Sequence, residues 1–251
     1  MLQVNRGEGM IDHNSSVPLY VQLEQALSRA IYEGEYRAGD KLPSENELCQ
    51  KFQVSRITVR QALNLLTQKD LVFSAHGKGT FVKVPDIGQE LDKIVSFRQV
   101  LQQKGLKGQT KVQSFCQEVS DSLARQHLGA QVCSLNLIGF AFRMPVVYYQ
   151  SFFRPQLGQQ MLTLAREAES VGNAFSTYDF YARLGIGVAR IDQTVRAVNA
   201  DQNLARLLEL PRGQALMVLE SLYIGEDGEV LEYKLGHYHS DIYSFRIHRR
   251  V

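Results

Sequence analysis

The amino-acid sequence predicts an α+β protein in two parts, an N-terminal winged helix-turn-helix and a C-terminal α/β domain built on an antiparallel sheet. Three observations predict this fold class. Residues 18–84 contain three amphipathic helical stretches followed by a glycine-tipped pair of β-prone runs. In the rest of the chain the order strand, helix, hairpin occurs twice. With 251 residues, 44% of them hydrophobic, the chain is long enough for two domains that each bury a core.

The first helix is predicted to begin at Pro18, because the missing N–H of proline is not needed in a first helical turn, and to end at Gly34. The second helix begins at Ser44, which opens the capping-box pattern Ser-Glu-Asn-Glu. After a tight corner, Ser55 can cap a third helix that runs through Lys69. Three helices with these connections predict a helix-turn-helix.

A β-hairpin is predicted after the third helix, because runs 71–75 and 80–84 flank the tip His76-Gly77-Lys78-Gly79. The segment that follows, with a proline and a glycine, indicates a linker. The predicted organisation is therefore an N-terminal extension over residues 1–17, a winged helix-turn-helix over 18–84, a linker over 85–92 and a second domain over 93–247.

The second domain is predicted from alternating strand and helix patterns. In order, these are a helix capped by Ser96, a strand over 110–118, a helix over 122–128, a hairpin of 132–142 and 146–153, helices over 159–169 and 176–184, a strand over 190–198, a helix capped by Asp201, and a hairpin of 215–224 and 229–245. Leu123-Ala124-Arg125 recurs as Leu204-Ala205-Arg206 in the second strand-helix-hairpin unit. This internal pseudo-repeat predicts two similar halves with a cleft between them, which is a natural small-molecule site.

Composition excludes several classes of protein. Lys and Arg total 28 and Asp and Glu total 26, and the formal net charge of +2 excludes a polycation that coats nucleic acid. The three cysteines lie far apart without a C-x-x-C pair, which argues against a disulfide framework and a cysteine zinc site. No apolar run reaches the roughly 18 residues of a membrane span, and no signal peptide is evident. We therefore expect a cytoplasmic protein with no membrane partner.

Charge is polarised within the first domain. Residues 18–50 carry three basic and six acidic side chains, whereas residues 51–83 carry six basic side chains and one acidic one. A solvated helix face would show the same charges, so the positions of the basic residues decide between the two interpretations. Arg56 and Arg60 lie one turn apart on the third helix and away from its apolar stripe, which suits them to guanine edges in a major groove.

Other polar groups in this domain suit the DNA backbone. The hydroxyls of Ser55 and Thr58 suit phosphates, and the slim tip at His76 can reach a minor groove or the backbone. The predicted partner is double-stranded DNA. The candidate contact residues are Ser44, Glu45, Ser55, Arg56, Thr58, Arg60, Gln61, His76, Gly77 and Lys78.

The first domain resembles the GntR family of bacterial transcription regulators. The resemblance rests on residues 18–20, 31–34, 39–45, 54–63 and 77–82, and it spans about residues 18–84. It implies a dimeric winged-helix repressor or activator. The base-reading arginines of the family fall on Arg56 and Arg60, and its wing-tip contact falls on His76. Asn46 stands where some members carry an arginine.

Residues 90–247 resemble the HutC subfamily, whose effector domain is called UTRA. The resemblance rests on Ser96-Phe97, on the segment 178–186, on residues 210–213 and on the ending from Glu232 to Phe245. It implies that a small, often anionic metabolite binds in the cleft: Ser96 offers a helix N-terminus, Arg183 pairs with the anion, and Glu232 and Tyr238 bind hydroxyls or an amine. The candidate effector-binding residues are Ser96, Phe97, Tyr149, Ser176, Arg183, Glu232, Tyr238 and Asp241.

This domain departs from the pattern of the subfamily. Residues 137–142 lack the arginines that many members carry, and His239-Ser240-Asp241 replaces the usual Arg-Gly-Asp. Aromatic side chains, namely Phe140, Phe142, Tyr148 and Tyr149, lie close by in sequence, either around the ligand or in the sheet core. We therefore expect an effector that is less charged than a sugar phosphate.

Two rival functions remain open for the C-terminal domain, an enzyme and a pure dimerisation module. No catalytic triad or pair of carboxylates stands out, so we expect neither catalysis nor a cofactor. His237, His239 and Asp241 alternate along one strand, which allows either a metal site or a polar surface. The basic tail over 246–250 allows either a contact with DNA or a partner, or a frayed end.

Overall fold

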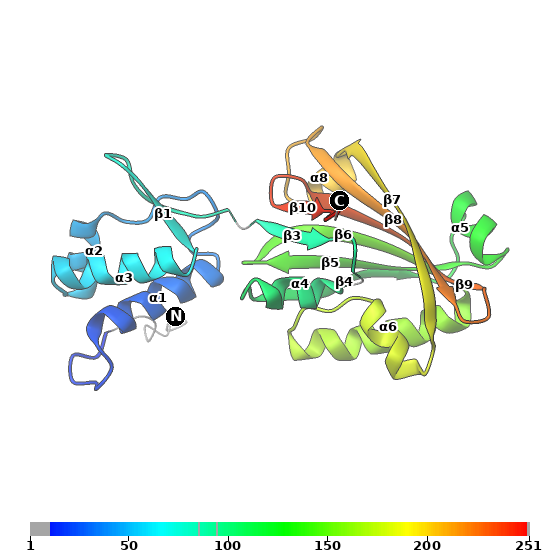
Figure 1. Ribbon diagram of the computed structural model, residues 1–251, viewed down its shortest axis with the longest axis horizontal. Coiled ribbons are helices and arrows are strands. Elements are labelled where there is room, and N and C mark those ends of the chain that lie inside the picture. Colours follow the sequence, from blue (N-terminus) through cyan, green and yellow to red (C-terminus); the bar gives the residue numbers. More distant parts are fainter. Residues whose placement is uncertain (1–10, 85, 94, 250–251) are drawn as a thin grey trace, which may run out of the picture. The chain divides into compact units, whose positions relative to one another are not determined.

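The computed structural model describes residues 11–84, 86–93 and 95–249, and it divides the chain into two compact units, residues 1–85 and 86–251 (Figure 1). The first unit contains the helices and hairpin expected of a winged helix-turn-helix, and the second contains an antiparallel sheet with helices. The predicted α+β class is confirmed. Residues 1–10 of the predicted extension lie outside the described residues.

Three helices form the body of the first unit: α1 (Leu19–Tyr32), α2 (Glu45–Phe52) and α3 (Arg56–Gln68). Ser44 makes the predicted capping box, because its N–H donates to the Glu47 carboxylate at 2.7 Å and its Oγ accepts from the Glu47 N–H. Gln53 adopts a left-handed backbone conformation with φ of 54°, which ends α2. The Oγ of Ser55 accepts from the Thr58 N–H at 3.2 Å and begins α3. Local capping therefore sets the turn between the two helices.

The core of the first unit lies between α1 and α3. The predicted stripe of α3, namely Val59, Ala62, Leu63 and Leu66, is buried. Glu24 of α1 is 2% exposed, and its carboxylate accepts from the Lys69 Nζ at 2.7 Å and from the Ser28 Oγ at 2.5 Å. This ion pair connects α1 to the end of α3.

The wing is an antiparallel hairpin of β1 (Val72–Ala75) and β2 (Gly79–Val82). At its tip, Gly77 has φ of 70°, a conformation that favours glycine, and the Lys78 N–H donates to the Ala75 carbonyl at 2.9 Å. The rings of Phe73 and Phe81 stack at 5.7 Å between centroids along the hairpin. The wing is thus a defined structure rather than a loose loop.

A six-stranded antiparallel sheet in the order β4-β5-β6-β9-β8-β7 forms the second unit. Its strands are β4 (Gly108–Cys116), β5 (Cys133–Ala141), β6 (Met144–Phe153), β7 (Val188–Asn199), β8 (Ala215–Gly225) and β9 (Val230–His239). The first half supplies β4, β5 and β6 from one edge inward, and the second half supplies β7, β8 and β9 from the other. The two halves meet at the β6–β9 pair, as the predicted repeat requires.

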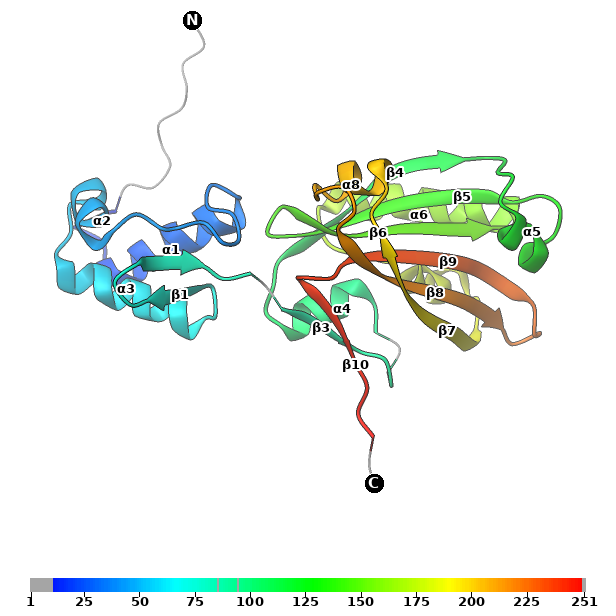
Figure 2. The ribbon, with the colours of Figure 1, turned by 90° about the horizontal axis from the view of Figure 1, so that it is seen from above.

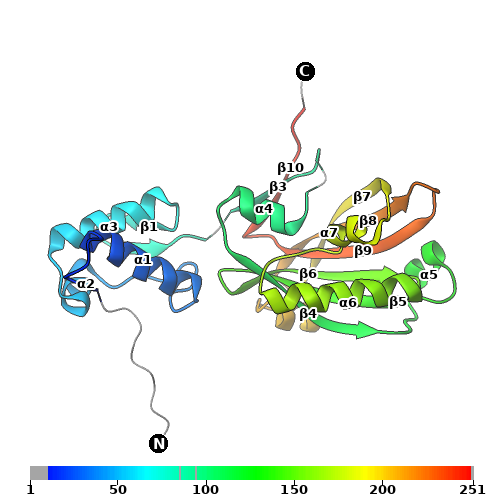
Figure 3. The ribbon, with the colours of Figure 1, turned by 90° about the horizontal axis from the view of Figure 1, so that it is seen from below.

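Helices cover both faces of this sheet. One face, which includes Tyr149 and Tyr238, packs against α4 (Phe97–Gln103), α6 (Pro155–Val171), α7 (Tyr178–Tyr181) and the 3₁₀ turn η1 (Ala182–Leu184). The other face packs against α5 (Ser122–Leu128) and α8 (Gln202–Leu207), which occupy equivalent places in the two halves. Figure 3 shows α6 lying along the sheet. Among the described residues, no helix is long and apolar enough to cross a membrane.

The ends of the second unit differ from the sequence prediction. The sequence predicts a linker over 85–92 and one continuous strand over 229–245, but β3 (Ile87–Glu90) and β10 (Tyr243–Arg246) form a separate parallel pair (Figure 2). The chain turns after β9 and leaves the main sheet. Ile87 is fully buried and Tyr243 is 1% exposed, so burial of these side chains outweighs the loop-like composition of the segment.

Candidate functional site

The first candidate site is the exposed side of α3 and the wing. The side chains of Arg56, Arg60 and Gln61 are exposed on α3, as predicted, and the wing tip from His76 to Lys78 is exposed as well. Ser55 and Thr58 hydrogen-bond to each other through their hydroxyls at 2.9 Å at the start of α3. The structure therefore presents the predicted arginines on an open surface.

Both arginines of α3 are held by the first turn of α2. The Arg60 Nε donates to both carboxylate oxygens of Glu45, each at 3.0 Å, and the Arg56 Nη2 donates to the Asn46 Oδ1 at 2.6 Å. The hydrogen bond to Glu45 raises the pKa of Arg60, which keeps the guanidinium charged. These contacts restrict the rotamers of two long side chains before any ligand binds. Glu45 and Asn46 are thus positioning residues for the two arginines.

The hydroxyl of Ser44 is engaged within its own helix. Its Oγ lies 2.7 Å from the Glu47 carboxylate and accepts from the Glu47 N–H. Hydrogen bonding to Ser44 lowers the pKa of Glu47, so this carboxylate stays ionised. The local role of Ser44 is therefore capping, and its predicted contact with DNA stays a prediction.

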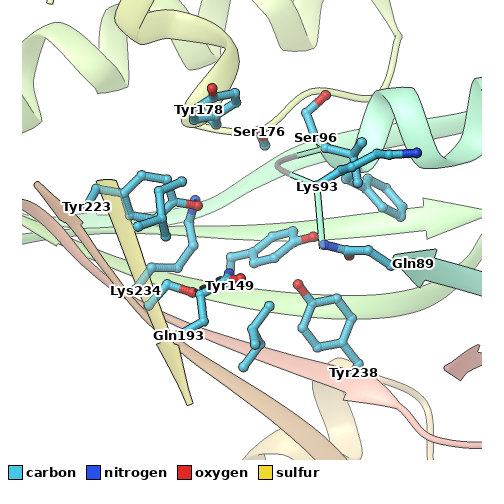
Figure 4. A pocket seen from close by; sticks show the side chains of 15 residues that line it. Gln89, Lys93, Ser96, Tyr149, Ser176, Tyr178, Gln193, Tyr223, Lys234 and Tyr238 are labelled. Atoms are coloured by element: carbon cyan, nitrogen blue, oxygen red, sulfur yellow. Dashed lines mark hydrogen bonds between the residues drawn. The ribbon is translucent and has the colours of Figure 1, made fainter. Parts of the chain in front are cut away.

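The second candidate site is a pocket in the second unit, on the sheet face that α4 and α7 cover (Figure 4). It encloses about 550 Å³ of space, including its opening to solvent. Its polar walls are Gln89, Lys93, Ser96, Ser176, Gln193, Ser221 and Lys234; its tyrosines are Tyr149, Tyr178, Tyr223 and Tyr238; and its apolar walls are Val95, Phe97, Ile191 and Leu219. These residues come from both repeated halves, so the pocket occupies the cleft that the repeat predicts.

Five of the eight predicted effector-binding residues line this pocket, namely Ser96, Phe97, Tyr149, Ser176 and Tyr238. Four aromatic residues, namely Phe140, Phe142, Tyr148 and Tyr149, have sequence positions that allow a place either around a ligand or in the sheet core, and of these Tyr149 alone lines the pocket. Its neighbour Tyr148 points to the opposite face and packs with Phe140 against the helix α8. Alternation along the strand β6 therefore puts one tyrosine in the pocket and the other in the core behind the sheet.

Arg183 does not line the pocket, and its predicted pairing with a bound anion is not supported. It lies in η1, its side chain is 53% exposed, and its Nη2 donates to Glu167 of α6 at 2.9 Å. The sequence predicted one helix over 176–184. The chain instead forms one turn of α-helix and a 3₁₀ turn, which directs Arg183 toward α6.

Glu232 and Asp241 also lie outside the pocket lining. Strand geometry correctly places Glu232 on the same face as Tyr238, but the carboxylate is fully buried and accepts from the Thr177 and Tyr181 hydroxyls at 2.8 and 2.9 Å. Asp241 follows the end of β9, is exposed, and accepts from the Gln214 Nε2 at 3.1 Å. The family resemblance implied a place for Asp241 beside the ligand, but the chain turns after β9 and Asp241 does not line the pocket.

Lys234 is the principal pocket residue that the sequence analysis missed. Its side chain is 7% exposed, and its Nζ lies 3.0 Å from Glu232 and also donates to the Thr177 hydroxyl. Burial alone would lower the pKa of Lys234, but the nearby Glu232 carboxylate raises it, and the net shift is upward. The ammonium therefore stays charged. The available signal was its alternation with Glu232 and Tyr238, which places all three on one face of β9.

Three tyrosines of the pocket, Tyr149, Tyr223 and Tyr238, are buried and carry neutral hydroxyls. Burial raises the pKa of Tyr149 and Tyr223 above the usual value, and it raises the pKa of Tyr238 to about 12. The rings of Tyr149 and Tyr238 meet edge to face at 5.8 Å between centroids. Their hydroxyls therefore remain protonated.

The histidines of β9 lie outside the pocket. His237 is buried on the opposite face, next to the Tyr148 ring at 6.1 Å, and burial lowers its pKa. His239 accepts from the Asp241 N–H at 3.3 Å. Among the described residues, no group of three or more His, Cys, Asp or Glu side chains is placed to hold a metal ion.

The beginning of the basic tail is ordered by pairing rather than frayed. Arg246 belongs to β10, and its Nη2 donates to Asp86 at 2.5 Å. The His248 Nε2 lies 3.7 Å from the carboxylate of Glu90. Arg250 lies outside the described residues. The tail is thus tied, at its first residues, to the segment that begins the second unit.

Both units are similar to known proteins. Residues 19–82 match the family described as bacterial regulatory proteins, gntR family, and residues 103–244 match the UTRA domain. The HTH-type transcriptional repressor NagR of Bacillus subtilis (strain 168) is 26% identical over 241 residues, which are 94% of this chain and 96% of that protein. The mannosyl-D-glycerate transport/metabolism system repressor MngR of Escherichia coli (strain K12) is 25% identical over 235 residues, which are 92% of this chain and 95% of that protein.

A solved structure shares the fold over almost the whole chain. The crystal structure of PhnF from Mycobacterium smegmatis superposes with a TM-score of 0.60 and is 24% identical in sequence. The match covers 91% of this chain and 99% of that one. The fold of this chain is therefore shared with that protein over most of its length.

Proposed function

Because this chain belongs to the gntR family of bacterial regulatory proteins and has the HutC architecture with a UTRA domain, it is a transcription regulator, and we propose that it binds a palindromic operator as a homodimer under the control of a small effector. Repression is the direction that the NagR and MngR relatives favour. No catalysis and no cofactor enter this proposal. DNA as the target is consistent with an expected cytoplasmic site of action.

The observation that carries the DNA-binding proposal is the exposed pair Arg56 and Arg60 at the start of α3. Guanidinium groups bind the O6 and N7 of guanine with two parallel hydrogen bonds, and the N-terminal part of the second helix of a helix-turn-helix meets base edges. Contacts to Asn46 and Glu45 hold both side chains in place, which lowers the entropy that binding must remove. The wing tip from His76 to Lys78 then contacts the adjacent groove or backbone.

The proposed dimer contact lies in the second unit, at the edge strand β7. Among the described strands, only β8 pairs with β7, and most side chains of β7 are exposed. Such an edge presents unpaired backbone groups to another strand. If two copies pair antiparallel about Thr194, each Asp192 lies opposite the partner's Arg196, so the strand is complementary in charge to itself.

The effector pocket is joined directly to the start of the second unit. Gln89 of β3 lines the pocket and accepts from the Tyr243 hydroxyl at 2.7 Å, and Lys93 and Ser96 line it a few residues later. This segment follows the DNA-binding unit in the chain. We propose that this segment has two conformational states with different affinities for DNA. A ligand that binds one state more tightly then changes the affinity for DNA, and DNA changes the affinity for the ligand by the same factor.

Selection of DNA fragments by the full chain tests the proposal. Fragments retained by the protein should share a palindromic sequence, and replacement of Arg56 by Ala should abolish their enrichment. Arg29→Ala, a change at an exposed arginine on α1, is the matched control and should leave enrichment intact. Retention of the same fragments by Arg56→Ala, or enrichment without any shared sequence, would contradict a specific operator.

A charge swap tests the proposed dimer contact. Asp192→Arg should weaken the dimer in sedimentation, because it places two arginines opposite each other, and the double variant Asp192→Arg/Arg196→Asp should restore it. If the single variant remains as dimeric as the unchanged chain, the contact lies elsewhere.

A further inference from the structure

The pocket has an unbalanced set of charges. Two lysines, Lys93 and Lys234, line it, and no carboxylate is among its lining residues within the described part of the chain. The carboxylate of Glu232 lies behind Lys234 and is fully buried, so it neutralises that ammonium without reaching the cavity. Lys93 is paired as well, since its Nζ lies 3.4 Å from the Glu90 carboxylate, but this pair is exposed and Glu90 is not among the lining residues. The site therefore offers a ligand two ammonium groups, each held by one carboxylate that lies outside the lining.

One of the three hydrogen bonds of the Lys234 ammonium is weak and can be replaced by a bond to a stronger acceptor. Its Nζ is 3.0 Å from Glu232 and also donates to Thr177, but its contact with the Tyr223 hydroxyl is long, at 3.4 Å. Ordinary N–H···O bonds are shorter than about 3.2 Å, so this third bond is weak and can be exchanged for a stronger one. A carboxylate oxygen is such an acceptor, because hydrogen bonds between two charged groups are shorter and stronger than neutral ones.

Aromatic rings fix the position of this ammonium. The Nζ of Lys234 lies 4.8 Å from the centroid of the Tyr223 ring and 5.6 Å from that of the Tyr149 ring. Figure 4 shows the lysine side chain between these two tyrosines. Cation–π contacts and the ion pair with Glu232 hold the ammonium in place, so little free energy is needed to orient it when a ligand binds.

The remaining walls favour an uncharged, partly apolar ligand body. Val95, Phe97, Ile191 and Leu219 supply apolar surface, and the hydroxyls of Tyr149 and Tyr238 supply neutral donors. A dianionic phosphate ester would bring two negative charges to a site whose two cations are each already paired with a carboxylate. Arg183, which the family resemblance implied would pair with an anion, is paired with Glu167 and does not line the pocket. The charges of the pocket therefore favour a ligand with a single negative charge.

On the premise of the proposed function, we propose that the effector is a small organic monocarboxylate with an apolar body, and that Lys234 and Lys93 bind its carboxylate. The apolar body lies against Phe97, Leu219 and the tyrosine rings. This assignment names the effector class and makes Lys234, rather than an arginine, the anchor of the anion.

Calorimetric titration of the full chain with matched probes tests this assignment. Benzoate, 4-hydroxybenzoate and cyclohexanecarboxylate are compared with the corresponding amides, which keep the shape and lose the charge. Glucose 6-phosphate and inorganic phosphate represent the dianions. At least one carboxylate should bind ten-fold or more tightly than its amide, and neither phosphate probe should bind comparably.

Two variants locate the carboxylate. The double variant Lys234→Met/Glu232→Gln removes both charges of the buried pair together, so that no buried carboxylate is left unpaired, and Lys93→Gln removes the other cation. Each should weaken carboxylate binding at least ten-fold. Lys104→Gln, an exposed lysine at the end of α4, is the matched control and should bind normally. Thermal unfolding without probe checks that each variant is folded.

The outcomes separate this inference from the proposed function. Equal binding of carboxylates and amides, binding of none of the carboxylates at millimolar concentration, or preference for a phosphate probe overturns the carboxylate assignment and leaves the regulator proposal standing. Normal carboxylate binding by the folded double variant overturns the role of Lys234. If a carboxylate binds as expected but leaves the operator complex unchanged, the assignment stands and effector control of DNA binding fails.

Discussion

The ammonium of Lys234 lies 3.0 Å from the Oε1 of Glu232, two residues earlier on β9, and both side chains are almost completely buried. Residues two apart on a strand point to the same face, so one strand supplies both members of the pair. Thr177 and Tyr181 provide the other partners of the carboxylate. Glu232 therefore holds the Lys234 ammonium without lining the pocket, while Lys234 itself lines it.

Breaking this pair from one side should destabilise the second unit strongly. Lys234→Met leaves a buried carboxylate without its cation, which costs about 3–5 kcal/mol in the free energy of unfolding. Lys234→Met/Glu232→Gln should lose much less, because both charges are gone. Urea unfolding of the two variants measures the difference. Equal stability of the single and double variants would show that the pair is not electrostatically coupled.

Loss of either recognition arginine should weaken specific DNA binding. Arg56→Ala or Arg60→Ala removes the proposed bidentate base contact, and such a contact is worth about 1–3 kcal/mol and sets base preference at one position. Titration of the selected operator at fixed salt measures the loss, and a panel of single-base changes measures the preference. An arginine whose replacement changes neither quantity does not contact a base.

Separation of the two units should weaken operator binding through loss of avidity. Residues 1–85 alone should fold, because the first unit has its own core, but they should bind the operator less tightly than the full chain. Residues 86–251 should sediment as a dimer. The division falls before β3, since a cut within that strand would remove part of its pairing with β10. A dimeric first fragment beside a monomeric second one would reverse the assignment of the dimer contact.

Acid should destabilise the second unit through His237 and His239 of β9. Burial lowers the pKa of His237 and of His239, with Asp201 and Asp241 respectively opposing part of the shift. In the unfolded chain both imidazoles become protonated near pH 6.5, whereas in the folded chain they become protonated only at a lower pH. The free energy of unfolding should therefore fall as the pH drops below 6.5, by up to about 1.4 kcal/mol per pH unit for the buried His237.

Urea unfolding at pH 7.5 and 5.5 measures this dependence. His237→Gln keeps a polar side chain of similar reach without a titrating ring, so it should reduce the difference in stability between the two pH values. An unchanged difference would assign the acid sensitivity to other groups.

The DNA-binding unit was predictable from sequence because its determinants are local. Ser44 and Ser55 each cap a helix by bonding three residues ahead, and Gln53 lies in the short turn between the two helices. Such signals do not depend on distant parts of the chain. The arginines followed from helical spacing alone, but their partners did not, because Glu45 approaches Arg60 only when α2 and α3 pack.

The pocket of the second unit was only partly predictable. Ser96 and Tyr238 follow from a family resemblance and Tyr149 from the aromatic residues of the first hairpin, and the structure brings all three together. Gln193 and Ser221, which bond to each other at 3.0 Å in the pocket wall, carry no signal in the sequence. They come from β7 and β8, and only the pairing register of these strands makes them neighbours.

By itself the sequence determined the α+β class, the order of the elements, the two repeated halves and the exposed arginine pair, since hydrophobic period and helix caps act over a few residues. Only the tertiary structure decided that Lys234 and not Arg183 faces the pocket, and that residues 87–90 join β10 instead of forming a linker. Burial and pairing between distant segments make these choices, because they are energies of contacts whose partners the local pattern does not specify.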